Sequence, residues 1–186
     1  MGMIQTIKVI NKMEADGVIG RYAIVGAFAA SYYVEPTLTA ELDILVSFEM
    51  EARQRKSGLV TLEPIFSYRK DKGYEEFRKD VVIEGWPVQF IPVADDLDAA
   101  ALAEAKEANI DDNAGAVRTR VLGAEHLVAS CLRIGRAKDF IRITQLLEGN
   151  VLDLPLLCTI LSRHGLTESW RAFCFRNGIS DPCGPY

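Results

Sequence analysis

The stretch YAIVGAFAASYYVEPTLTAELDILV, residues 22–46, holds two apolar segments separated by small residues and a proline. Its second apolar segment carries Glu41 and Asp43 two positions apart. Side chains at positions i and i+2 of a strand point to the same face, so the two carboxylates are expected to project together while the residues between and after them enter a core. Adjacent carboxylates on a buried strand are costly without a cation, and Mg²⁺ suits such oxygen ligands.

The residues around this acidic strand predict a compact frame. Residues 22–25 form an apolar strand, Gly26 and Ala27 open a short helix that runs to about residue 34, and Pro36 ends it. Upstream, the spacing of apolar residues predicts a helix over 3–16.

Beyond the acidic strand, the pattern alternates between strands and helices. We expect an exposed connection or a short helix over 49–57 and a helix over 59–72. Two strands over 77–84 and 86–93 should be joined as a hairpin at Glu84-Gly85. A helix over 97–108 capped by Asp95-Asp96 and an edge strand over 117–122 complete this half.

After Gly123 the apolar spacing is helical throughout. The sequence therefore predicts an α+β (mixed α/β) fold: a core of a small mixed sheet flanked by helices over residues 1–122, and a C-terminal helical region over residues 123–186 that packs on it. No flexible linker separates the two parts.

Composition places the chain among ordinary globular proteins. It has 186 residues, 49% of them hydrophobic and 25% charged, and no apolar run long enough for a membrane span, so we expect a cytoplasmic protein without a membrane partner. The net charge of −5 argues against a dedicated nucleic-acid binder. The four cysteines are widely spaced without a CxxC motif, which favours free thiols in a reducing cytosol over disulfides or zinc.

Four short motifs follow one another along the chain: VGA at 25–27, TAELD at 39–43, WPVQFIP at 86–92 and GRAKD at 135–139. Their order and spacing resemble the nucleotidyltransferase fold of the DNA polymerase β type, and its bacterial abortive-infection and toxin–antitoxin branch in particular. The resemblance spans about residues 20–165.

This resemblance implies Mg²⁺-dependent transfer of a nucleoside monophosphate from an NTP to an acceptor hydroxyl. The catalytic and metal-binding carboxylates would be Glu41 and Asp43, with Gln89 at the position of the third metal ligand. The nucleotide would be contacted by Gly26, Ala27, Ser31 and Lys138.

Three positions depart from the family pattern. Glu41 replaces an aspartate, Ala27 replaces a glycine or serine, and Gln89 replaces the third acid, so that no carboxylate there can deprotonate an acceptor. Glu84, on the preceding strand, would replace the missing third acid only if the hairpin placed its side chain in the site. The resemblance therefore predicts nucleotide binding with slow turnover or none.

Two alternatives stay open on the sequence. One is a catalytically inactive nucleotide-binding, toxin–antitoxin or regulatory module whose apolar helical tail contacts a partner or a second copy of the chain. The other is a different α+β enzyme, in which the two acids are coincidental and Gln89 is an ordinary polar residue of a half-buried strand. The acceptor, whether RNA, a protein side chain or a small molecule, is not specified.

Overall fold

The computed structural model describes residues 2–36, 39, 41–47, 65, 68, 76–77, 80–112 and 115–184. Its helices are α1 (Met3–Ala15), α2 (Gly26–Ala30), α5 (Asp96–Ala103), α6 (Ala124–Ile134), α7 (Ala137–Glu148), α8 (Leu154–Arg163) and α9 (Thr167–Asn177). Its strands are β1 (Tyr22–Ile24), β2 (Leu42–Val46), β3 (Glu76–Phe77), β4 (Asp80–Ile83), β5 (Trp86–Pro92), β6 (Lys106–Asp112) and β7 (Gly115–Val121).

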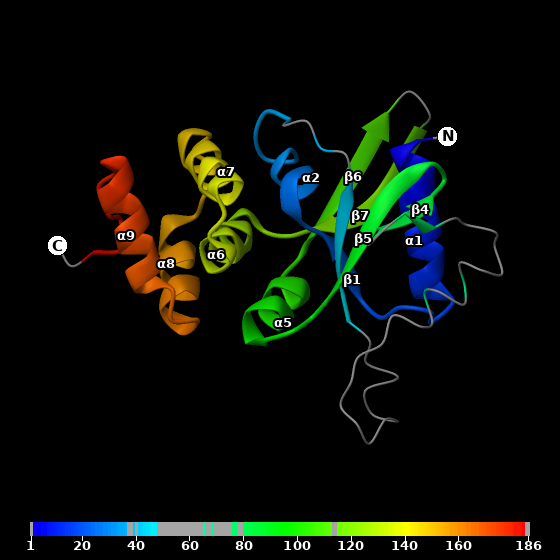
Figure 1. The fold of residues 1–186 in the computed structure, drawn as a ribbon, viewed down its shortest axis with the longest axis horizontal. Coiled ribbons are helices and arrows are strands. Elements are labelled where there is room, and N and C mark those ends of the chain that lie inside the picture. Colours follow the sequence, from blue (N-terminus) through cyan, green and yellow to red (C-terminus); the bar gives the residue numbers. More distant parts are fainter. Residues whose placement is uncertain are drawn as a thin grey trace, which may run out of the picture.

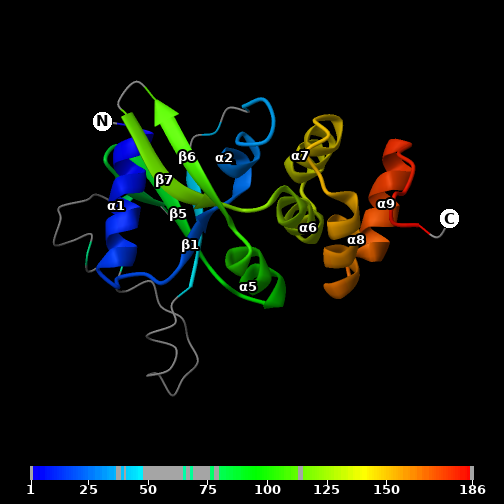
Figure 2. The same cartoon turned by 180° about the vertical axis from the view of Figure 1, so that it is seen from behind.

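Within these residues the strands form one mixed sheet in the order β3-β4-β5-β2-β1-β7-β6. The β1–β2 pair is antiparallel, whereas β2–β5 and β1–β7 are parallel. Helix α1 lies across one face of the sheet, where its side chains reach β4, β1 and β7. On the opposite side, α2 and α5 lie between the sheet and the group α6–α9, as both views show (Figures 1 and 2). The predicted mixed α/β class, with strands first and helices after them, is confirmed.

The sheet and α1 form where the apolar pattern predicts. The α1 stripe of Ile4, Ile7, Ile10 and Met13 is fully buried. The hairpin of β4 and β5 closes through Glu84 and Gly85, both with positive φ, which is the backbone that a two-residue hairpin turn requires.

Two predictions on the second half of the sheet are wrong. The helix expected over 97–108 ends at Ala103, and Lys106 begins strand β6. Strand β6 pairs with β7 along its whole length, so β7 lies inside the sheet instead of at its edge. The strand KEANIDD escapes a pattern search because, among the side chains that the structure describes in it, only Ala108 is buried. An exposed edge strand has little need of apolar residues.

The helical region has a core of its own around α6. Trp170 and Phe173 of α9 are buried and stack on each other, and Phe173 also stacks on Phe140 of α7. Glu125 of α6 is 2% exposed and accepts a hydrogen bond from the Asp153 backbone N–H at the start of α8 (2.8 Å).

The prediction of four free thiols is wrong for Cys158 and Cys183, which form a disulfide. The tail after α9 folds back because Asp181 accepts hydrogen bonds from the Trp170 indole (2.8 Å) and from the Cys183 backbone N–H (2.9 Å). This return brings together two cysteines that are 25 residues apart. Cys131 and Cys174 are free and buried, as expected for small apolar residues.

Other predictions fall outside the described residues. The connection over 49–57 lies there entirely, as does the helix over 59–72 apart from Ile65 and Tyr68. Among the described helices, none has the length and apolar character needed to cross a membrane.

Candidate functional site

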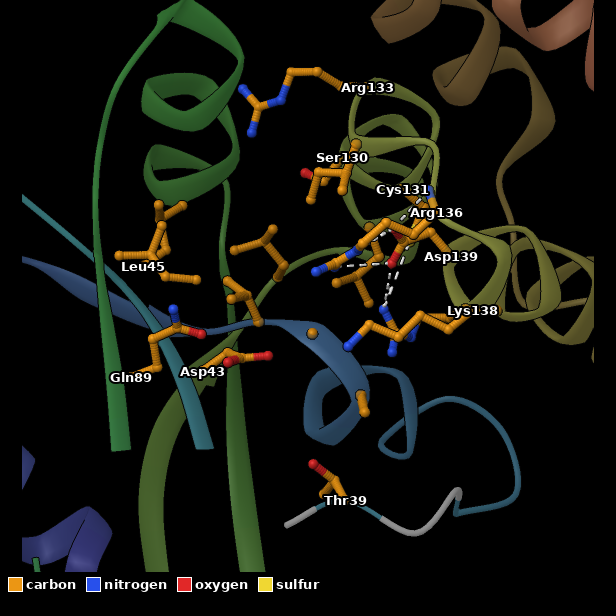
Figure 3. Close-up of a pocket in the computed structure, with 18 of the residues that line it drawn as sticks. Thr39, Asp43, Leu45, Gln89, Ser130, Cys131, Arg133, Arg136, Lys138 and Asp139 are labelled. Atoms are coloured by element: carbon orange, nitrogen blue, oxygen red, sulfur yellow. Dashed lines mark hydrogen bonds and ion pairs between the residues drawn. The ribbon is translucent and has the colours of Figure 1, made fainter. Parts of the chain in front are cut away.

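A cavity of about 320 Å³ lies between the sheet with α2 and the helices α6 and α7 (Figure 3). One wall carries the acidic strand β2 and its neighbour β5, and the facing wall carries the start of α7. The sheet wall contributes Gly26, Ala27, Glu41, Asp43 and Gln89 to the lining. The shared cavity required for the glycine turn, the acids and Gln89 to act together is therefore present.

The strand pairing explains why Asp43 and Gln89 meet. Strands β2 and β5 are parallel, with Asp43 directly opposite Gln89. Leu42 and Ile44 are fully buried, so the alternation of the strand turns Asp43 toward the cavity, where Figure 3 shows it beside Gln89. The predicted division of this strand into an apolar face and an acidic face is confirmed.

Asp43 is held in an unfavourable environment for a charge. Burial is the main cause that raises the pKa of its carboxyl to about 6, and the negative charge of Glu41 adds to it. Lys138, Arg142 and Arg136 act in the opposite direction from across the cavity. Among the described residues, no donor forms a hydrogen bond or an ion pair with this carboxylate.

Gly26 is required by the position of Asp43. Its φ is +68°, and a Cβ built on it would collide with the Asp43 carboxylate oxygen Oδ2. The backbone of α2 thus approaches the carboxylate more closely than any other residue type allows. A larger residue at this position would therefore displace the Asp43 carboxylate.

The facing wall is cationic and is organised by a buried acid. Asp139 is fully buried and accepts hydrogen bonds from the Arg136 backbone N–H (3.1 Å) and Arg136 Nε (2.8 Å), and from Arg142 Nη1 (3.4 Å). Lys138, two residues after Arg136, extends toward the sheet wall in Figure 3. Its ammonium group has no hydrogen-bond or ion-pair partner in the described part of the chain.

Near α5 the cavity is lined by a further arginine that is paired with acids. Arg133 of α6 forms ion pairs with Asp95 and with Asp98 (2.6 Å to Oδ1), the first of which also caps α5. Beside it, Ser130 lines the cavity without a hydrogen-bond partner among the described residues. The remaining lining there is apolar and includes Leu45, Ile91 and Leu127.

The sheet wall fits a magnesium ion by its donor set. Glu41 and Asp43 offer carboxylate oxygens and Gln89 offers an amide oxygen, and these are hard ligands of the kind Mg²⁺ prefers. Burial and the charge of Glu41 raise the pKa of Asp43, and a bound cation would favour its ionised form. The described residues contain no group of three or more acidic, histidine or cysteine side chains placed to hold a metal.

Sequence reasoning found most of this lining and missed its organisation. Of the predicted site residues, Ser31 alone lies away from the cavity, and its hydroxyl donates to the Phe28 carbonyl within α2 (2.8 Å). Glu84 sits in the β4–β5 turn and is not part of the lining. The lining residues that were not predicted as site residues include Asp98, Ser130, Cys131, Arg133, Arg136, Asp139 and Arg142. The i±3 spacing of the arginines around Asp139 is the signal for its paired role.

No protein-family model matches the sequence, and no curated protein matches it. Solved structures resemble the fold. One is the antibiotic-resistance factor ANT(2″)-Ia, at a TM-score of 0.45 and 17% identity over 94% of this chain and 92% of that one. Another is an antigenic nucleotidyltransferase-like protein from Paracoccidioides brasiliensis, at a TM-score of 0.44 and 15% identity over 89% of this chain and 91% of that one. Likenesses this distant carry no argument about activity.

Proposed function

We propose that the cavity binds a nucleoside triphosphate with Mg²⁺ and that the chain is a nucleotidyltransferase-like protein. The observation that supports this is the placement of two carboxylates and an amide on one wall and three cations on the wall that faces it. A triphosphate with its metal carries both kinds of charge and is matched by such a pair of walls.

Each wall has a distinct task in this proposal. Glu41, Asp43 and Gln89 hold the metal, which when bound offsets the charge of the triphosphate and of the reacting oxygens. Lys138 and the Arg136 guanidinium contact phosphate oxygens, and the buried Asp139 keeps Arg136 in place. Gly26 and Ala27 form the turn at the start of α2 that borders the phosphate path.

Calorimetric titration with each NTP in the presence of Mg²⁺ tests the proposal. We expect binding that Asp43→Asn weakens together with its metal dependence, and that Lys138→Gln weakens roughly tenfold. Lys12→Gln on α1 removes an exposed lysine 60% accessible to solvent and is the matched control. If no NTP binds with Mg²⁺ present, the proposal fails.

A second candidate is a binding module without catalysis, whose helical region contacts a protein partner or a second copy of the chain. Phe175 of α9 is 90% exposed and Ile141 of α7 is 61% exposed, which is unusual for large apolar side chains. Light scattering of the chain and of Phe175→Ser tests it. A monomer that captures no partner through Phe175 would remove the support for this candidate.

A further inference from the structure

None of the described residues that line the cavity is free to take a proton from an acceptor. Gln89 stands opposite Asp43 and carries a neutral amide, which cannot take a proton from an acceptor. Asp98 is engaged by Arg133 and by the Ala94 backbone N–H (3.1 Å), and Asp139 is engaged by two arginines. No histidine or tyrosine is among the described residues of the lining. With Glu41 and Asp43 assigned to the metal, no free base remains among the described lining residues.

The neutral side chain of Gln89 also affects whether the cavity can bind an anionic acceptor. A carboxylate at this position repels an anion, whereas a primary amide presents two N–H donors to it. The Gln89 side chain has no hydrogen-bond partner among the described residues, so these donors are available to the cavity. Figure 3 shows the amide beside Asp43, on the wall opposite Lys138 and Arg136.

From these observations we infer that Gln89 selects an acceptor whose attacking oxygen is already ionised, a carboxylate or a phosphate monoester, in place of a hydroxyl. The inference rests on the proposed function. An acceptor oxygen attacks the α-phosphorus of the NTP, the bond from that phosphorus to the bridging oxygen of the β-phosphate breaks, and pyrophosphate leaves with the bonding electrons. No proton has to leave the acceptor. The product is an acyl nucleotide anhydride from a carboxylate and a pyrophosphate diester from a phosphate.

Matched small acceptors of one shape test this selection. Benzoate, phenyl phosphate and benzyl alcohol share a ring suited to the apolar end of the cavity and differ in the attacking oxygen. With Mg²⁺ and labelled NTP, we expect transfer to one or both anions at a rate at least roughly 100-fold above transfer to the alcohol, the range that general base catalysis contributes elsewhere. Comparing transfer to benzoate with transfer to phenyl phosphate shows whether the acceptor is a carboxylate or a phosphate.

Variants at Gln89 separate its chemical role from a structural one. Gln89→Glu should lose anion transfer roughly tenfold or more and gain transfer to benzyl alcohol, because it adds a base and a repelling charge. Gln89→Ala should weaken the anion acceptors without gaining the alcohol. Gln5→Glu on α1 adds the same charge away from the cavity and should change neither.

Binding gives a readout that does not depend on turnover. With Mg²⁺ and a non-hydrolysable NTP analogue present, calorimetry should show phenyl phosphate or benzoate binding to the wild-type chain and binding lost in Gln89→Glu. A chain that binds Mg²⁺–NTP yet transfers to no anion, or transfers to benzyl alcohol at least as fast, overturns the inference and leaves the proposed binding function standing. Absence of NTP binding would remove both.

Discussion

At the scale of the residue, Asp43 makes stability depend on pH. Its pKa is about 6 in the fold against an ordinary value of 3.8, so the folded state binds the proton more tightly than the unfolded chain does. The contribution that proton binding by Asp43 makes to the free energy of unfolding is fully present below pH 3.8. It is lost as the pH rises through about 6. The ionised carboxylate therefore destabilises the metal-free fold at neutral pH.

Asp43→Asn should consequently stabilise the metal-free protein at about pH 8, by roughly 1–2 kcal/mol after allowance for the partial exposure of the carboxyl. The gain should vanish near pH 4, where the wild-type group is protonated. Urea unfolding of both chains at the two pH values measures it. Added Mg²⁺ should stabilise the wild type only, and an equal gain at both pH values would contradict the account.

Gly26 and Asp43 should be energetically coupled. Gly26→Ala places a side chain at φ +68° and against the Asp43 carboxylate, whereas Gly17→Ala meets a similar φ of +71° with no atom within 4 Å. Both substitutions should lower the free energy of unfolding by about 1–2 kcal/mol, because an alanine is strained at positive φ. Gly26→Ala should lower it by about 1–3 kcal/mol more, because of the collision with Asp43. Chemical denaturation measures both, and the extra loss should shrink in an Asp43→Ala background. Equal losses at the two glycines would show that the contact is unimportant.

The residues of the acidic strand were readable from the sequence, because alternation along a strand fixes which side chains share a face. The pattern of residues did not predict the pairing of Asp43 with Gln89, since register between strands far apart in the chain depends on the whole sheet. The resemblance alone placed Gln89 with the two acids. The cationic wall was seen only as a motif around Lys138. Its anchor, Asp139, is buried by tertiary packing that no local pattern reports.

At the scale of the element, the start of α7 depends on Asp139. Asp139 is fully buried and pairs with Arg136 and Arg142. Neutralising it would leave both arginines without their charged partner. Asp139→Asn should cost about 2–4 kcal/mol and weaken NTP binding. Glu168→Gln breaks an exposed pair with Arg171 on α9 and should cost less than about 0.5 kcal/mol. Thermal and chemical unfolding compare them, and similar costs would exclude an organising role.

Helices and strands that bury a regular set of apolar side chains were predicted correctly from the sequence. The exposed strand β6 was not. Helix α1 and strands β1, β2 and β5 bury regular sets of apolar residues. Strand β6 is held by backbone hydrogen bonds to β7, and backbone pairing leaves no mark on the pattern of side chains. The disulfide was missed for a similar reason, because the return of the tail over α8 depends on tertiary contacts of Asp181.

At the scale of the whole molecule, the disulfide fastens the tail to α8. It closes a loop of 25 residues, for which the loss of chain entropy in the unfolded state corresponds to about 2–4 kcal/mol. Cys183→Ser should lower the free energy of unfolding by that amount under oxidising conditions, and reduction of the wild type should reproduce the loss. A reductant should leave Cys183→Ser unchanged, and a wild type insensitive to reduction would contradict the prediction.

The proposed parts over residues 1–122 and 123–186 should unfold together. Helix α6 joins them, because its buried face packs against α2 and α5 on one side and against α7, α8 and α9 on the other. Leu127, Val128 and Leu132 of that helix are at most 6% exposed, so separating the parts would expose apolar area that neither covers alone. One cooperative transition is expected.

The two tryptophans of the chain provide the measurement, since Trp86 lies in β5 and Trp170 in α9. Trp170→Phe leaves a fluorophore in the sheet and Trp86→Phe leaves one in the helical region. Each variant should show the same denaturation midpoint by its own fluorescence and by circular dichroism, because a cooperative unit loses both signals at once. A midpoint for the Trp170 signal distinct from that of circular dichroism would mean that the helical region unfolds on its own, and that the cavity opens before the sheet is lost.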